Sequence, residues 1–176
     1  MPLNLWHDVP RGTTQALNAI IEIPMGSRVK YELDKKTGII KYDRVLYSPM
    51  HYPANYGFVP QTLWDDGDPL DVLVLGAEEL VPGCLIEVRP IGVLDMVDGG
   101  DGDAKILAVP CNDPRWNNTN DISNVEAHIL EEIKHFFKVY KTLQNKEVFV
   151  GEWRDRVEAD KDIEKSFVLY DEMMHK

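Results

Sequence analysis

Residues 65–76 read DDGDPLDVLVLG, an acidic turn that leads directly into an apolar strand. Asp, Gly and Pro are the residues that turns prefer, so the first half alone is typical of a solvated surface turn. In the second half, Asp71 falls on the same side of the strand as Leu73, while Val72 and Val74 point to the other side. A carboxylate at the edge of an apolar surface needs a positive partner. The stretch therefore predicts a core strand with a cation beside Asp71.

Short strands separated by turns are predicted on both sides of this stretch. In residues 27–34 apolar and charged side chains alternate, as in a half-buried strand, and residues 35–38 form a predicted hairpin turn. Residues 48–60 contain three prolines and predict an irregular, extended connection. The predicted strands are residues 19–24, 27–34, 39–47, 70–76, 84–97 and 104–110. Several short strands at this spacing favour a small barrel or sandwich.

Helical patterns occur only after Pro110. Ser123 and Glu126 predict a capping box at the start of a helix that extends through residues 123–143, with an apolar stripe along one face. A second helix is predicted from about Val157 onward. We therefore expect one domain over residues 1–176, of α+β class and mainly β, with two helices of the C-terminal half packed outside the strands.

Composition narrows the classes of partner. Thirty acidic residues against nineteen Lys and Arg residues give a formal net charge of −11, which opposes binding to nucleic acid or to an anionic membrane surface. No segment approaches the roughly 20 apolar residues of a membrane-spanning helix, and the first residues do not resemble a secretory signal. A cytoplasmic protein is expected. Cys84 and Cys111 have no metal-ligand spacing, and we expect buried free thiols without a functional role.

A second acidic group lies in residues 95–105, DMVDGGDGDAK, at a predicted turn between two strands. A solvated loop is the simplest interpretation. If the fold brings this turn and residues 65–71 to the same end, their carboxylates form a pocket of hard oxygen ligands suited to Mg²⁺, Mn²⁺ or Ca²⁺. Two unit charges about 4 Å apart repel by about 4 kcal/mol at an effective dielectric constant near 20. Such a pocket therefore predicts a bound divalent cation.

Cationic side chains are predicted near the same pocket. Lys30 shares a strand face with Glu32, Arg44 lies near the end of the next strand, and Lys105 follows the second acidic group. Each of these cations alone is typical of a solvated surface. Together with several metal-binding carboxylates they favour phosphoryl chemistry, because metal ions and cations neutralise a polyanion while a carboxylate deprotonates the attacking water.

The chain resembles the soluble inorganic pyrophosphatases of the first family. The resemblance rests on residues 21–32, IEIPMGSRVKYE, on residues 43–63, DRVLYSPMHYPANYGFVPQTL, on the DGDPLDV motif of residues 66–72, on residues 89–110 and on HFFKVYK at residues 135–141. It implies a five-stranded barrel of the OB type with helices beside it. It also implies hydrolysis of pyrophosphate to two phosphates with several Mg²⁺ ions, Mn²⁺ or other divalent ions being alternatives, and a homo-oligomer, expected to be a hexamer.

The resemblance also implies roles for particular residues. Asp68 matches the proton acceptor for the attacking water. The matching metal ligands and their supporting acids are Asp66, Asp71, Asp98, Asp103, Glu22 and Glu32. The groups that match phosphate contacts are Lys30, Arg44, Tyr56, Lys105, Tyr140 and Lys141. Without the resemblance, Tyr56 and Tyr140 would be interpreted as core residues.

Some questions stay open from the sequence. The resemblance assigns no role to Asp65, Asp95 or Asp101. The alternative function is a non-catalytic, calcium-binding module of the OB type. Asp68 discriminates between the two, because a calcium module has no need of a carboxylate that acts as a base.

Overall fold

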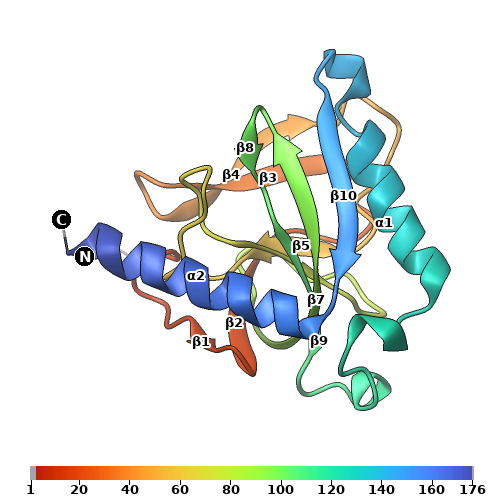
Figure 1. Ribbon diagram of the computed structural model, residues 1–176. Coiled ribbons are helices and arrows are strands. Elements are labelled where there is room, and N and C mark those ends of the chain that lie inside the picture. Colours follow the sequence, from red (N-terminus) through yellow and green to blue (C-terminus); the bar gives the residue numbers. More distant parts are fainter. Residues whose placement is uncertain (1–2, 176) are drawn as a thin grey trace.

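A closed ring of five strands forms the centre of the computed structural model, which describes residues 3–175 (Figure 1). Neighbouring strands are antiparallel except β6 and β9, and β7 pairs with both β9 and β2, which closes the ring. In order, the ring strands are β2 (Ala16–Ile23), β5 (Asn55–Phe58), β6 (Asp71–Val74), β9 (Lys105–Pro110) and β7 (Leu85–Asp98). The α+β, mainly β fold class is confirmed, and the ring agrees with the expected OB-type barrel.

Alternate side chains of the ring strands enter two different apolar clusters. Val72 and Val74 pack in one cluster with side chains of β2, β7 and β9, while Leu73 belongs to a second cluster. The predicted alternation along β6 is therefore correct, and both faces of this strand are buried. Because Asp71 precedes these residues at the start of β6, its side chain lies at the edge of the apolar layer.

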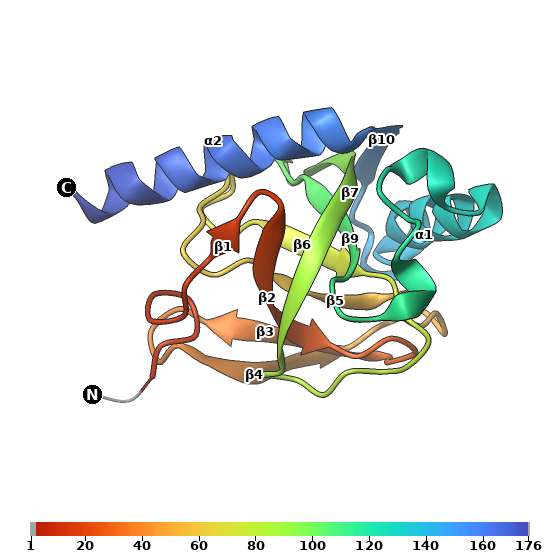
Figure 2. The ribbon, with the colours of Figure 1, turned by 90° about the horizontal axis from the view of Figure 1, so that it is seen from below.

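Two helices pack outside the ring, as expected (Figure 2). Helix α1 (Ala127–Val139) places Ile133, Phe136 and Phe137 in the same cluster as Leu73. Helix α2 (Arg156–Met174) contributes Ala159 and Ile163 to the cluster of Val72. The helices thus cover different sides of the ring and leave one region of it open for the acidic turns.

A separate two-stranded sheet stands beside the ring. It consists of β3 (Val29–Asp34) and β4 (Ile39–Val45), joined by a tight turn. The remaining elements are short or peripheral: β1 (Gly12–Thr13), β8 (Asp101–Gly102), β10 (Val148–Arg154) and the 3-10 turns Pro114–Trp116, Ile122–Asn124 and Thr142–Gln144.

Two expectations about the elements are wrong, and one strand was missed. Residues 55–58 are not an irregular connection but the ring strand β5. The predicted hairpin of residues 27–34 and 39–47 is confirmed as β3 and β4, which form a sheet separate from the ring. Strand β10 was not predicted at all. The capping box is also displaced: Ser123 lies in a 3-10 turn, and Glu126 is itself the N-cap of α1, accepting from the backbone N–H groups of residues 128 and 129.

The two cysteines are free, as expected, but each is only half-buried. Both lie next to strand ends, because Cys84 precedes β7 and Cys111 follows β9.

Candidate active site

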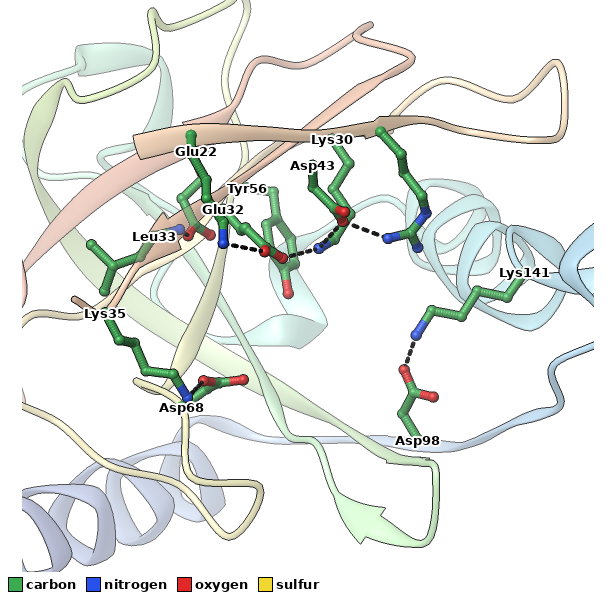
Figure 3. A network of polar contacts seen from close by, with 12 residues as sticks. Glu22, Lys30, Glu32, Leu33, Lys35, Asp43, Tyr56, Asp68, Asp98 and Lys141 are labelled. Atoms are coloured by element: carbon green, nitrogen blue, oxygen red, sulfur yellow. Dashed lines mark hydrogen bonds and ion pairs between the residues drawn. The ribbon is translucent and has the colours of Figure 1, made fainter. Parts of the chain in front are cut away.

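One cavity of about 550 Å³ lies between the β3–β4 hairpin, the two acidic turns and the C-terminal end of α1 (Figure 3). The fold thus brings both acidic turns to the same end, as the metal hypothesis required. All predicted site residues except Arg44 line this cavity, namely Glu22, Lys30, Glu32, Tyr56, Asp66, Asp68, Asp71, Asp98, Asp103, Lys105, Tyr140 and Lys141.

The cation expected beside Asp71 is Lys105. Strands β6 and β9 run parallel with Asp71 opposite Lys105, and the Lys105 Nζ donates to Asp71 Oδ2 at 2.5 Å. The same ammonium donates to the Tyr56 hydroxyl at 3.0 Å. It also donates to the Asp103 carboxylate. Burial raises the pKa of Asp71 to about 7, although Lys105 opposes the rise. Burial alone would lower the pKa of Lys105, but Asp71 and Asp103 hold it well above its usual range.

Glu22 lies at the floor of the cavity and is 7% exposed. Its Oε1 accepts from the backbone N–H of Leu33 at 2.7 Å, which ties β2 to the hairpin. Burial raises the pKa of Glu22 to about 8, and the charge of Asp71 adds to the rise, while the hydrogen bond from Leu33 opposes it. In the absence of metal ions, Glu22 therefore holds its proton at neutral pH.

The hairpin forms a charged wall that contains an acid not predicted from the sequence. Asp43 Oδ2 accepts from Lys30 Nζ at 2.9 Å and from a terminal nitrogen of Arg44 at 2.5 Å. Lys30 also donates to Glu32 at 3.0 Å. Burial alone would raise the pKa of Asp43, but Lys30 and Arg44 hold it below its usual value. Arg44 itself lies beside the cavity without lining it, and its second terminal nitrogen is 3.5 Å from Gln144 Oε1.

Two further ion pairs stand at the rim. Lys35 Nζ lies 2.5 Å from Asp68 Oδ1, and Lys141 donates to Asp98 (Figure 3). Lys35 was not among the predicted site residues. No motif identified it, because a lysine in a hairpin turn is usually a solvated charge.

The three acids without an assigned role lie away from the cavity lining. Asp65 pairs with Lys165 of α2 at 2.8 Å, and Asp95 pairs with Arg154 of β10 at 2.6 Å. Asp101 is exposed in β8. Asp65 and Asp95 thus hold neighbouring elements together.

Tyr140 and Tyr56 fit both interpretations, as core residues and as residues of the site. Their rings belong to the apolar cluster with Phe137, and both residues line the cavity. Burial raises the pKa of each hydroxyl far above its usual value, so both remain protonated hydrogen-bond donors.

The donor set fits divalent metal ions. Six carboxylates from β2, the two acidic turns and β6 converge on one cavity, and carboxylate oxygens are the ligands that Mg²⁺ prefers. Within residues 3–175 no three such side chains already form a ligand set around one point. The lysine contacts account for this, because the ammonium of Lys105 lies between Asp71 and Asp103 and that of Lys141 neutralises Asp98.

Comparison with known proteins gives consistent results. A family model described as inorganic pyrophosphatase matches residues 19–171. The soluble inorganic pyrophosphatase of Zea mays is 51% identical over 167 residues, which is 94% of this chain and 78% of that protein. The corresponding protein of Oryza sativa subsp. indica is 50% identical with the same coverage.

Solved structures also resemble this chain. The crystal structure of inorganic pyrophosphatase from Thermus thermophilus superposes with a TM-score of 0.92 at 42% identity, covering 96% of this chain and 99% of that one. The Helicobacter pylori inorganic pyrophosphatase gives a TM-score of 0.88 at 43% identity, over 93% and 97% of the two chains. Among the described residues, no helix has the length and apolar character needed to cross a membrane.

Proposed function

The chain belongs to the inorganic pyrophosphatase family, and we propose that it hydrolyses inorganic pyrophosphate to two phosphates in the cavity between the hairpin and the acidic turns. The observation that carries this proposal is the convergence of both acidic turns on one cavity that also contains Lys30, Lys105 and Lys141. Family membership gives no support to the alternative of a non-catalytic calcium-binding module.

Divalent ions, Mg²⁺ in our proposal and Mn²⁺ as an alternative, are held by the carboxylates of the cavity. When bound, such ions neutralise the charge of the diphosphate and lower the pKa of the attacking water. The ligands are Asp66, Asp71, Asp98 and Asp103, with Glu22 and Glu32 as supporting acids. A cation bound beside Glu22 would lower its raised pKa, so we expect metal binding to release this proton.

The cationic and phenolic groups hold the two phosphates. Lys30 and Arg44 are oriented by Asp43, which keeps two positive charges together on the hairpin wall. The other contacts are Tyr56, Lys105, Tyr140 and Lys141. Such groups stabilise the negative charge that grows on the leaving phosphate, because a fixed cation needs no rearrangement during the reaction.

Asp68 accepts the proton. The oxygen of the attacking water forms a bond to one phosphorus, the bond from that phosphorus to the bridging oxygen breaks, and the bridging oxygen leaves with the second phosphate. The proton of the water passes to the Asp68 carboxylate, which lies at the rim of the cavity and is exposed to solvent.

The test is phosphate release from pyrophosphate, measured with Mg²⁺, with Mn²⁺ and with EDTA. We expect activity with the divalent ions, none with EDTA, and a fall of about 10² to 10⁴ in kcat for Asp68→Asn. The matched control is Asp65→Asn, which removes a carboxylate from the same turn but outside the cavity, and its kcat is expected to stay near that of the wild type. A folded wild-type protein that releases no phosphate with either ion would overturn the proposal.

The assembly and the location of the chain are separate proposals. We propose that it forms a homo-oligomer, with a hexamer as the expected state. The resemblance to the family is what supports this proposal. Light scattering on the purified protein tests the number of subunits.

A single domain over residues 1–176 and a cytoplasmic location stay predictions.

A further inference from the structure

Lys35 spans the mouth of the cavity from the hairpin to the acidic turn that bears Asp68. It follows the last residue of β3, and its Nζ lies 2.5 Å from Asp68 Oδ1 and 3.3 Å from the carbonyl oxygen of Gly67 (Figure 3). The hairpin is a separate sheet from the ring, so this contact joins two units of the fold.

The backbone of Asp68 is also held by hydrogen bonds within its own turn, besides the contact of Lys35 with the Gly67 carbonyl. Its carbonyl oxygen accepts from the Trp64 N–H at 2.8 Å, and its own N–H donates to Asp66 Oδ1 at 3.0 Å. Gly67 supplies the positive φ of +81° that the turn requires. The carboxylate is held differently: within residues 3–175 its one side-chain contact is with Lys35. The backbone turn thus places Asp68, while Lys35 sets the direction of its carboxylate.

We propose that Lys35 is a positioning residue for hydrolysis. By donating to Oδ1 it fixes the rotation of the carboxylate and leaves Oδ2 free to accept the proton of the attacking water. This inference rests on the proposed function of Asp68 as the proton acceptor. A residue that acts through geometry affects the rate of the chemical step, because a misplaced base transfers the proton less efficiently.

The expected effect is moderate because the pair is exposed. The side chains of Lys35 and Asp68 are 49% and 55% exposed, and exposed ion pairs are weak. We expect Lys35→Met to lower kcat by about fivefold with little change in KM. Lys35→Arg keeps a cation at this position and is expected to restore most of the rate.

The same turn supplies a matched control. On its outer side Asp65 pairs with Lys165 at 2.8 Å, and the two side chains are 46% and 45% exposed. Lys165→Met therefore removes an ion pair of the same kind and exposure from the same turn without touching Asp68. Its kcat is expected to equal that of the wild type.

The experiment measures kcat and KM for pyrophosphate in the Mg²⁺-loaded protein, for the wild type, Lys35→Met, Lys35→Arg, Lys165→Met, Asp68→Asn and the double variant Lys35→Met/Asp68→Asn. If Lys35 acts through Asp68, its loss lowers kcat in the wild type but has no further effect in Asp68→Asn. Thermal unfolding confirms that each variant is folded.

Several results would overturn the inference. One is an unchanged kcat in Lys35→Met, and another is a change in KM alone, which is the signature of a substrate contact. The inference also fails if Lys165→Met loses as much kcat as Lys35→Met, or if Lys35→Met lowers kcat by the same factor in the Asp68→Asn background. A wild type that releases no phosphate would instead overturn the proposed function, so the two failures are distinguishable.

Discussion

At the scale of single residues, the charge balance of the cavity depends on Lys105. Its side chain is 3% exposed and touches two acids, Asp71 and Asp103. Removal of one partner from a buried ion cluster leaves charges unpaired, so Lys105→Met is expected to lower the free energy of unfolding by about 3–5 kcal/mol in EDTA. Saturating Mg²⁺ should reduce this loss, because divalent ions neutralise the same carboxylates. Urea unfolding with and without Mg²⁺ measures both values.

Lys134 provides the control for this prediction. It is also a buried lysine, but its partner Glu152 is exposed and stays solvated when the lysine is removed. Lys134→Met should therefore lower the free energy of unfolding much less than Lys105→Met does. Equal losses for the two variants, or a loss in Lys105→Met that Mg²⁺ does not change, would contradict the assigned charge balance.

Glu22 leads to a prediction about pH. Because its pKa is raised from 4.5 to about 8 in the folded protein, the folded state binds its proton more tightly than the unfolded chain does. The resulting stabilisation is complete below pH 4.5 and is lost as the pH rises through about 8. In EDTA, the free energy of unfolding of the wild type should therefore fall relative to Glu22→Gln by up to about 1.4 kcal/mol per pH unit between pH 5 and pH 8.

Thermal or urea unfolding across this pH range tests the prediction, with Glu22→Gln as the reference that cannot ionise. In Mg²⁺ the two proteins should differ less in the pH dependence of their stability, since a nearby cation favours the ionised carboxylate. Parallel pH profiles for the two proteins in EDTA would show that Glu22 keeps an ordinary pKa.

The sequence predicted most of the cavity residues but not all of them. The first acidic turn carries its own signal, because four of the seven residues 65–71 are Asp and need a counter-charge. Asp43 carries no such signal: it is the extra residue of a bulge, since Lys30 pairs with Arg44 while Tyr31 pairs with Tyr42. A shift of register of this kind is decided by packing and is not visible in the alternation of residue types.

At the scale of elements, the start of α1 is set by Glu126. Its side chain accepts from the backbone N–H groups of His128 and Ile129 at 2.9 and 3.2 Å. Glu126→Ala should lower the free energy of unfolding by about 1 kcal/mol, the usual value of an N-cap. Ser123→Ala tests the position first predicted from the sequence and should change stability by less than about 0.5 kcal/mol, because Ser123 lies in the preceding turn. Chemical unfolding of both variants decides between the two positions.

Strand β5 depends on a glycine at a close approach to β2. A Cβ added to Gly57 would lie 1.9 Å from the backbone oxygen of Ile20, which cannot move without disturbing the ring. Gly57→Ala is therefore expected to lower the free energy of unfolding by about 3 kcal/mol or more. Gly76→Ala is the control, since its nearest neighbours would be 3.8 Å away. Equal stability of the two variants, measured by urea unfolding, would contradict this packing.

The same glycine explains why β5 was missed in the sequence. Residues 55–58 lie in a segment with three prolines, and Gly57 weakens the strand pattern further. The strand forms because its neighbours β2 and β6 supply hydrogen bonds on both sides and all four of its residues are buried. Tertiary pairing thus overrides local propensity here, while β6 was predictable because its alternation and its burial agree.

At the scale of the whole molecule, the carboxylates of the cavity come from distant parts of the chain. Glu22 belongs to β2, Asp71 to β6, and Asp103 to the segment before β9. An ion held between them binds the folded state and not the unfolded chain, and a ligand at 100 times its Kd stabilises the folded state by about 2.7 kcal/mol. We therefore expect Mg²⁺ to raise the urea midpoint of the complete unfolding transition while the slope of that transition stays the same.

Salt is the necessary control, because a chain with a net charge of −11 is also stabilised by simple screening. NaCl at matched ionic strength should raise the midpoint far less than MgCl₂, since screening acts weakly on buried charges. Asp71→Asn should lose most of the specific Mg²⁺ effect and keep the salt effect. If NaCl reproduced the shift, or if Asp71→Asn retained it, the stabilisation would come from the surface charge of the molecule and not from ions held in the cavity.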